Sequence, residues 1–157
     1  TEAKVFVSGS TDGSSSYMMT SSGARLAMWK LSIQEIAQRP LIGAGTGSYR
    51  HLAKQAFTDS ALCGITCVHP HNQFLFFGVE YGLVGIAAYL FYFYRASRFA
   101  NTLAQAQQSL LLGFLGVLFV DSMVHGALWL AVESHFFTFM MALFMATAVP
   151  QKTTETP

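Results

Sequence analysis

Two histidines on either side of a proline are the residues of this chain best suited to chemistry. The segment His69-Pro70-His71-Asn72 stands directly before a long apolar run, which places the His71 imidazole at a membrane–water boundary. An imidazole there can act as a general base or donate a hydrogen bond to an anion near the lipid headgroups. A histidine that only contributes to a polar rim would give the same pattern, so these residues alone leave both interpretations open.

Arg25 is the second candidate, because it falls near the start of a predicted helix. Ser21 or Ser22 can cap that helix, and apolar residues at helical spacing predict an amphipathic helix over about 24–38. A guanidinium beside the free amides of a helix start makes an anion site. The alternative is an arginine that is solvated or that snorkels along the helix face.

A glycine-rich turn follows this helix. The sequence Gly43-Ala-Gly-Thr-Gly-Ser48 lacks the Lys-Ser/Thr ending of a phosphate-binding loop, and no hydrophobic strand precedes it. Its glycines, among them Gly45 and Gly47, indicate a tight turn through which the backbone approaches another group closely.

Cys63 and Cys67 lie four positions apart, shortly before the histidines. In an oxidising compartment they can form a disulfide, but the spacing alone does not decide this. With His69 and His71 they also offer four zinc ligands. Structural zinc sites, however, take their second pair of ligands from a distant segment, so we expect no metal here.

Composition divides the chain into a water-facing part and a membrane part. Charged residues make up 11% of the 157 residues, against about 25% in soluble domains, and apolar residues make up 52%. Six of the nine Lys and Arg residues precede His71. The net charge of +1, without a basic patch, gives no support to nucleic-acid binding.

Three apolar runs in the second part of the chain predict membrane-spanning helices. The first is long enough to cross a hydrocarbon core of roughly 30 Å, while the other two are marginal in length. A soluble protein with very apolar buried helices is the alternative. The predicted spans cover residues 73–94, 109–125 and 134–149, within a membrane part over 72–150.

Two arginines set the expected orientation. Arg95 and Arg98 begin the short connection after the first span, so the positive-inside rule places that connection in the cytoplasm. Residues 1–71 then form a large, partly helical periplasmic loop, and residues 151–157 form a cytoplasmic tail. Because the chain starts at Thr1 without an insertion signal, we expect further spans of the same protein before it.

Polar residues are expected to gather at the outer turn between the second and third spans. Glu80, by contrast, lies inside the first span, where it is either a packing contact or a functional residue, since an ionisable group within a membrane is a candidate site residue. The residues of the outer turn are Asp121, His125, Trp129, Glu133 and His135.

Three segments resemble the O-antigen ligase family. His71-Asn72, followed after nine residues by Gly82-Leu-Val-Gly85, resembles that family's signature of His, then Asn, Ser or Gln, nine residues, and Gly-x-x-Gly. Residues 23–49 resemble its periplasmic stretch, in which an Arg-x-x-x-Trp helix leads into a Pro-Leu-x-Gly-x-Gly-x-Gly turn. Residues 121–144 resemble its last outer loop and final span, so the resemblance covers about residues 23–149.

The resemblance implies an all-α, polytopic membrane enzyme of the GT-C type, of which this chain holds the last three spans. Such O-antigen ligases transfer a glycan from undecaprenyl diphosphate to lipid A–core in lipopolysaccharide biosynthesis, on the periplasmic side of the bacterial inner membrane and without a metal or other cofactor. By motif, His71 corresponds to the family's essential histidine and Arg25 to an arginine that contacts the diphosphate. A further essential arginine lies upstream, so we expect this fragment alone to be inactive. The residues expected beside them in the substrate site are His69, Asn72, Gly45 and Gly47.

The chemistry of this reaction suits those residue types. The leaving group is a lipid diphosphate, so catalysis needs charge stabilisation, and Arg25 can hold two phosphate oxygens in a bidentate fork. His71 can deprotonate the acceptor hydroxyl or donate to the diphosphate, and the lack of a neighbouring acid in the sequence slightly favours the second role. The expected partners are the lipid-linked glycan donor, the lipid A–core acceptor and membrane lipids.

Two other functions remain open at this point. An O-antigen polymerase or a pilin O-oligosaccharyltransferase has the same fold class and shares much of the motif pattern. A non-enzymatic transporter or membrane scaffold, in which glycines and histidines merely pack helices, is the alternative from another class.

Overall fold

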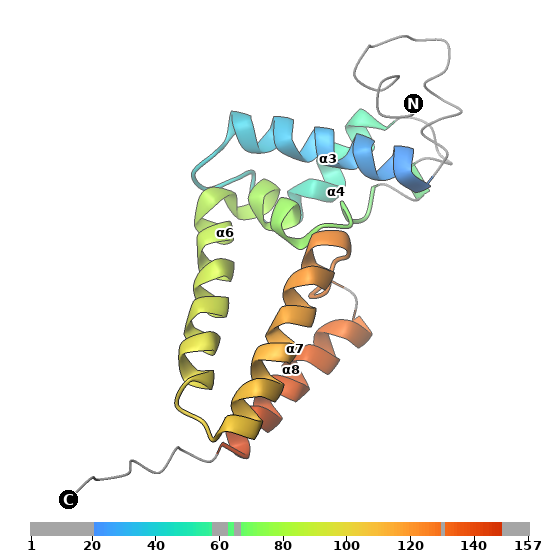
Figure 1. Cartoon of the computed structure of the whole chain (residues 1–157). Helices are drawn as coiled ribbons and strands as arrows, with labels where there is room; N and C mark the ends of the chain where they lie inside the picture. Colours follow the sequence, from blue (N-terminus) through green and yellow to red (C-terminus); the bar gives the residue numbers. More distant parts are fainter. Residues whose placement is uncertain (1–20, 58–62, 65–66, 130, 149–157) are drawn as a thin grey trace, which may run out of the picture.

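The computed structural model describes residues 21–57, 63–64, 67–129 and 131–148, and every regular element among them is a helix. Helices α3 and α4 form a layer at one end of the molecule, and the more apolar helices α6, α7 and α8 extend away from it (Figure 1). The predicted cytoplasmic tail lies outside the described residues. The helices are α3 (Ser21–Gln38), α4 (Ser48–Ala56), α6 (Gln73–Ala100), α7 (Gln105–Val124) and α8 (Ala131–Ala146).

Helix α3 begins earlier than its sequence pattern predicts. Ser21 and Ser22 already lie within the helix, so they do not cap a helix that starts near residue 24. Residues 21–24 precede Arg25 in the helix, so Arg25, contrary to what the sequence pattern predicts, does not stand beside the free amides of a helix start. Arg25 projects from the next turn and is exposed.

Helix α6 is broken at Gly82. This residue has φ 64° and ψ −155°, a backbone conformation that is essentially restricted to glycine. The bend brings the ring of Phe74 to 5.3 Å from the ring of Tyr89, fifteen positions later. In a straight helix the two residues would be about 22 Å apart along the axis. The predicted first span is thus not one straight helix: its first part lies under α3, and the part beyond Gly82 runs beside α7 (Figure 1).

The turn that follows α3, residues 40–45, forms backbone hydrogen bonds with α6 on both sides of this break. The amides of residues 44–45 donate to the last carbonyls before it, those of residues 79–80, at 2.8 and 2.9 Å. In return, the amides of residues 83–84 donate to the carbonyls of residues 40–41 at 2.7 and 3.2 Å. Backbone groups that a broken helix leaves unpaired are costly in an apolar environment, and these four bonds satisfy them.

The fit between turn and break leaves no room for a side chain at two glycines. A Cβ added to Gly43 would lie 2.6 Å from the backbone of residues 79–81, and a Cβ added to Gly82 would lie 2.5 Å from the backbone of Leu41. The close backbone approach that the glycine-rich turn suggests therefore takes place, at Gly43, against α6.

Glu80 joins α6 to α4. Its carboxylate is buried, accepts a hydrogen bond from the Gly47 amide at 2.9 Å, and also accepts from the amide of Tyr49. A carboxylate at a helix start satisfies amides that have no partner within the helix and interacts favourably with the helix dipole. Of the two roles suggested for Glu80, the packing contact is the one that this geometry supports.

The apolar part of the molecule consists of α7 packed between the second part of α6 and α8. The hydroxyls of Tyr89 and Ser122 share a buried hydrogen bond of 2.7 Å between α6 and α7, and Phe137 of α8 is buried near Leu118 of α7. Helices α6 and α7 are long and apolar enough to cross a membrane, whereas α8, with 16 residues, is shorter than that. Many large apolar side chains on these helices are exposed, as lipid contact requires.

Substituting Gly82 should weaken the joint between α3 and α6. We expect Gly82→Ala to lower the melting temperature of the intact protein in detergent by several degrees, because alanine is strained there by roughly 1–3 kcal/mol and its methyl group pushes the turn away. Gly116→Ala is the matched control, since an added Cβ at that α7 position meets nothing within 4 Å. Equal melting temperatures for the two variants would contradict the broken helix.

Candidate functional site

The His69–Asn72 segment lies where α3, the start of α6 and the end of α7 meet. The indole N–H of Trp29, on α3, donates to the carbonyl of Pro70 at 3.0 Å. The side-chain amide of Asn72 donates to the carbonyl of Met123, in the last turn of α7, at 2.9 Å. These two bonds attach the segment to both neighbouring helices, which fixes where its histidines stand.

Asn72 also caps α6. Its side-chain oxygen accepts from the amide of Leu75 at 2.9 Å, and its backbone is extended, as the residue before a helix usually is. The Asn, Ser or Gln that follows the histidine in the family signature is thus explained here by a helix cap. Substrate contact by Asn72 stays a prediction, and the described bonds use both ends of its side-chain amide within the protein.

His71 lies beside a second histidine, His125. It is half-buried, and its ring centroid lies 5.8 Å from that of His125, which follows α7 directly. Burial first, and then the charges of Arg25 and His125, lower the pKa of His71. His71 is therefore mainly neutral at neutral pH. A bound anion would offset this repulsion and draw its pKa back up.

Arg25 and His71 are 46 positions apart in the sequence, but the bond from Trp29, one turn after Arg25, to Pro70, next to His71, brings their segments together. The described contacts also bring in His125, whose Nδ1 lies 3.8 Å from the carboxylate of Asp121. The sequence places both residues at the outer turn but does not identify them as site residues. Asp121 and His125 lie near His71 because α7 packs antiparallel to α6, and sequence periodicity does not reveal this packing.

His69 is buried, with 5% of its surface exposed. Its Nδ1 accepts a hydrogen bond of 2.9 Å from the backbone amide of His71. Burial, and to a smaller extent the neighbouring His71 and His125, lower the pKa of His69 to about 3. The imidazole of His69 is therefore neutral throughout the physiological range.

Gly45 and Gly47 lie at the other end of the first part of α6. Their amides donate to Glu80, one to its backbone carbonyl and one to its carboxylate. Glu80 is about 12 Å along the helix axis from the start of α6 beside His71. The structure therefore does not bring these glycines next to His71, and their predicted substrate contact stays untested.

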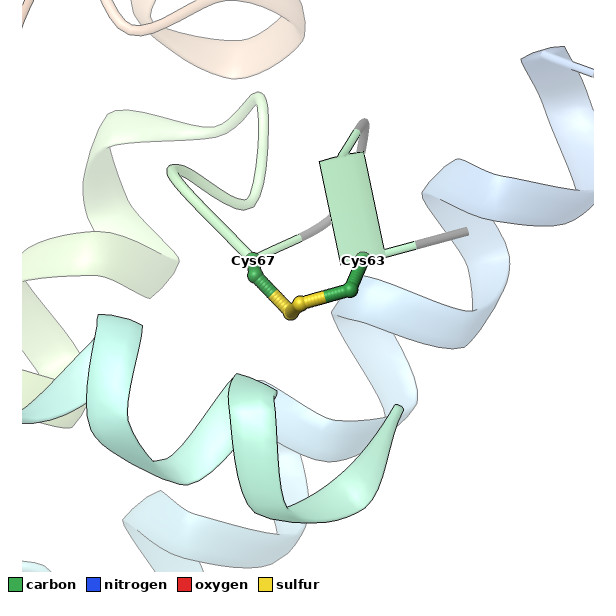
Figure 2. Close-up of a disulfide and its surroundings, with 2 residues drawn as sticks. All are labelled: Cys63 and Cys67. Carbon is green, nitrogen blue, oxygen red and sulfur yellow. A yellow bond between two sulfur atoms is a disulfide. The ribbon is translucent and has the colours of Figure 1, made fainter. Parts of the chain in front are cut away.

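Cys63 and Cys67 are joined in a disulfide, with their Cα atoms 4.8 Å apart (Figure 2). Cys67 is buried in a cluster with Tyr49, Ala53 and Phe76, two positions before His69. The spacing of the two cysteines did not decide whether they form a disulfide, and the structure shows that they do. Sulfurs joined in a disulfide are unavailable as zinc ligands. Within the described parts of the chain, no three His, Cys, Asp or Glu side chains are arranged to hold a metal ion.

Acid should destabilise the protein through His69. Below about pH 6.5 the unfolded chain binds a proton at this residue that the folded protein excludes until its pKa of about 3. Lowering the pH from about 7 to about 5 should therefore cost about 2 kcal/mol at this position. Melting temperatures of the intact protein across this range, compared with those of His69→Asn, would measure it. The variant should lose less stability in acid, and an identical pH dependence would contradict a buried neutral His69.

A family model described as O-antigen ligase matches residues 6–90, which is 85 of the 157 residues. The matched range includes Arg25, the glycine-rich turn, the disulfide, His71 and the break in α6, and it ends within the second part of α6. None of the curated proteins matches this chain.

Proposed function

This chain belongs to the O-antigen ligase family, and we propose that it carries the transfer site of a glycosyltransferase that moves O-antigen polysaccharide from undecaprenyl diphosphate to lipid A–core. The observation that carries the proposal is that His71 lies beside His125 and that the bond from Trp29 to Pro70 holds the helix of Arg25 against the same segment, at the end of two helices apolar enough to cross a membrane. A lipid diphosphate has its anionic group at this depth, where apolar chain gives way to water. In this proposal the chain is part of a multi-pass GT-C-type bundle.

Two independent features support the periplasmic side of the inner membrane for this site. Arg95 and Arg98 lie within α6, which extends beyond the predicted end of the span at residue 94, at its end opposite the layer formed by α3 and α4 (Figure 1), and arginines next to the end of a span favour the cytoplasmic side. The disulfide lies at the α3–α4 end, and disulfides form in oxidising compartments such as the periplasm.

Arg25 is proposed to bind the diphosphate. Its side chain is exposed and close enough to His71 to lower the pKa of that residue, so it can hold phosphate oxygens beside the imidazole. A guanidinium offers a bidentate fork to phosphate and stabilises the charge that develops on the leaving group.

His71 is proposed to act as the general base. Its lowered pKa favours the neutral imidazole, which can accept the proton of the acceptor hydroxyl. The acceptor oxygen then bonds to the anomeric carbon, and the carbon–oxygen bond to the diphosphate breaks with its electron pair leaving on the diphosphate. This differs from the diphosphate contact that the sequence slightly favours, because the sequence does not reveal that His71 is half-buried and close to Arg25.

Replacing His71 should abolish transfer. We expect His71→Ala in the intact protein to remove the O-antigen ladder from lipopolysaccharide gels, with a loss of at least about 100-fold in rate, because no base remains. Membrane insertion should be unchanged. His51→Ala is the matched control, since His51 is an exposed histidine of α4. A normal ladder for His71→Ala would refute the catalytic role.

The same gels separate a ligase from a polymerase of this family. Loss of a ligase leaves complete polymer on undecaprenyl diphosphate, whereas loss of a polymerase leaves single repeats attached to the core. We expect accumulation of lipid-linked polymer, and single repeats on the core would assign the chain to polymerisation instead.

Arg25→Lys tests the bidentate contact, since it keeps the charge but removes the planar fork. We expect Arg25→Lys in the intact protein to lower the transfer rate by about tenfold or more. Arg50→Lys, at an exposed position of α4, should transfer at the wild-type rate. If Arg25→Lys is as active as wild type, a point charge suffices and the bidentate role is wrong.

A further inference from the structure

His71 has an unusual backbone conformation. Its φ is +50°, and it is the only residue other than glycine with a positive φ in the part of the chain that the structure describes. Side chains with a Cβ are disfavoured in this left-handed region. Some contact must therefore hold the backbone of His71 against its own preference.

The described contact that can do this comes from His69. Its Nδ1 accepts the His71 amide at 2.9 Å, which requires that Nδ1 carry no proton. The low pKa of His69 excludes the doubly protonated ring, so the proton of the neutral ring is on Nε2. That atom is buried and has no hydrogen-bond partner among the described residues. A buried N–H without a partner is unfavourable, so packing, rather than a bond at Nε2, must hold this ring.

Three neighbours enclose the ring of His69. Its centroid lies 4.9 Å from that of Phe76 and 5.8 Å from that of Trp129, with the Trp129 ring stacked at an interplanar angle of 26°. Gly126 closes the remaining side, because a Cβ there would collide with the imidazole. The ring is thus fixed by α6 on one side and by the turn after α7 on the other.

We propose that His69 is a positioning residue for His71: it accepts the His71 amide, holds that backbone in the left-handed region, and so keeps the His71 ring beside that of His125. The inference rests on the proposed function of His71. It differs from the substrate contact first expected of His69, since a 5% exposed ring whose Nδ1 is already bonded has little surface to offer a glycan.

Three substitutions separate the hydrogen bond from the packing. Asparagine places an oxygen close to the position of Nδ1 and keeps the acceptor. Glutamine places its amide nearer to Nε2, and phenylalanine keeps the ring but has no acceptor. Transfer rates of the intact protein in lipid vesicles, with a lipid-diphosphate-linked glycan as donor, would compare them.

We expect His69→Asn to stay within about threefold of wild type, and His69→Gln and His69→Phe to lose about tenfold or more in kcat, since small misplacements of a catalytic group cost this much. KM for the donor should change little. His69→Phe should melt close to the wild-type temperature, because removal of the unpartnered N–H offsets the loss of the acceptor for the His71 amide. Wild-type kcat for His69→Phe, or equal losses for Asn and Phe, would overturn the inference.

Gly126→Ala provides a second test that leaves the imidazole in place. The added methyl group should displace the His69 ring and lower kcat, while Gly113→Ala, where a Cβ meets nothing within 4 Å, should not. Unchanged kcat for Gly126→Ala would also count against the inference. His71→Ala in the same assay tests the proposed function separately from the positioning role. If His71→Ala is inactive while His69→Phe is fully active, only the positioning role of His69 fails. If His71→Ala is active, the proposed function itself is wrong.

Discussion

A helix that breaks near a membrane must find partners for the backbone groups it frees, and this requirement shapes the molecule. At Gly82 two carbonyls and two amides lose their partners within α6, and residues 40–45 supply four replacements. Because that turn follows α3 directly, the bonds hold the end of α3 over the first part of α6. The two glycines at the joint allow contact distances that no side chain would permit.

The site follows from holding α3 at two places. The glycine-rich turn holds its C-terminal end, and the bond from Trp29 to Pro70 holds the middle of the helix. Arg25, one turn before Trp29, is therefore kept close to His71. The end of α7 closes the third side through Asn72 and His125. Three segments far apart in the sequence thus converge on one imidazole, and the guanidinium of Arg25 makes that position attractive to an anion.

Much of this arrangement could be predicted from the sequence, and the rest depends on information that sequence patterns do not hold. The apolar runs and the spacing from His71 to Gly82 identify the family and its helices, because periodicity and motifs are local. The break in α6 was not predicted, since glycines within a long apolar run do not by themselves mark a break in a span. His125 was placed at the right turn but not at the site, because its contact with His71 joins positions 54 apart. The positive φ of His71 was also not predicted, since it results from tertiary contacts.

The most direct test of the central claim, that the turn after α3 is bonded into the break of α6, is hydrogen exchange at single residues in the intact protein in lipid. Ala44 and Gly45 lie in a turn and would exchange rapidly if their amides faced water. The account predicts that both exchange as slowly as amides within α6, because they donate to the carbonyls of Val79 and Glu80. Exchange at the rate of an unstructured loop would contradict it.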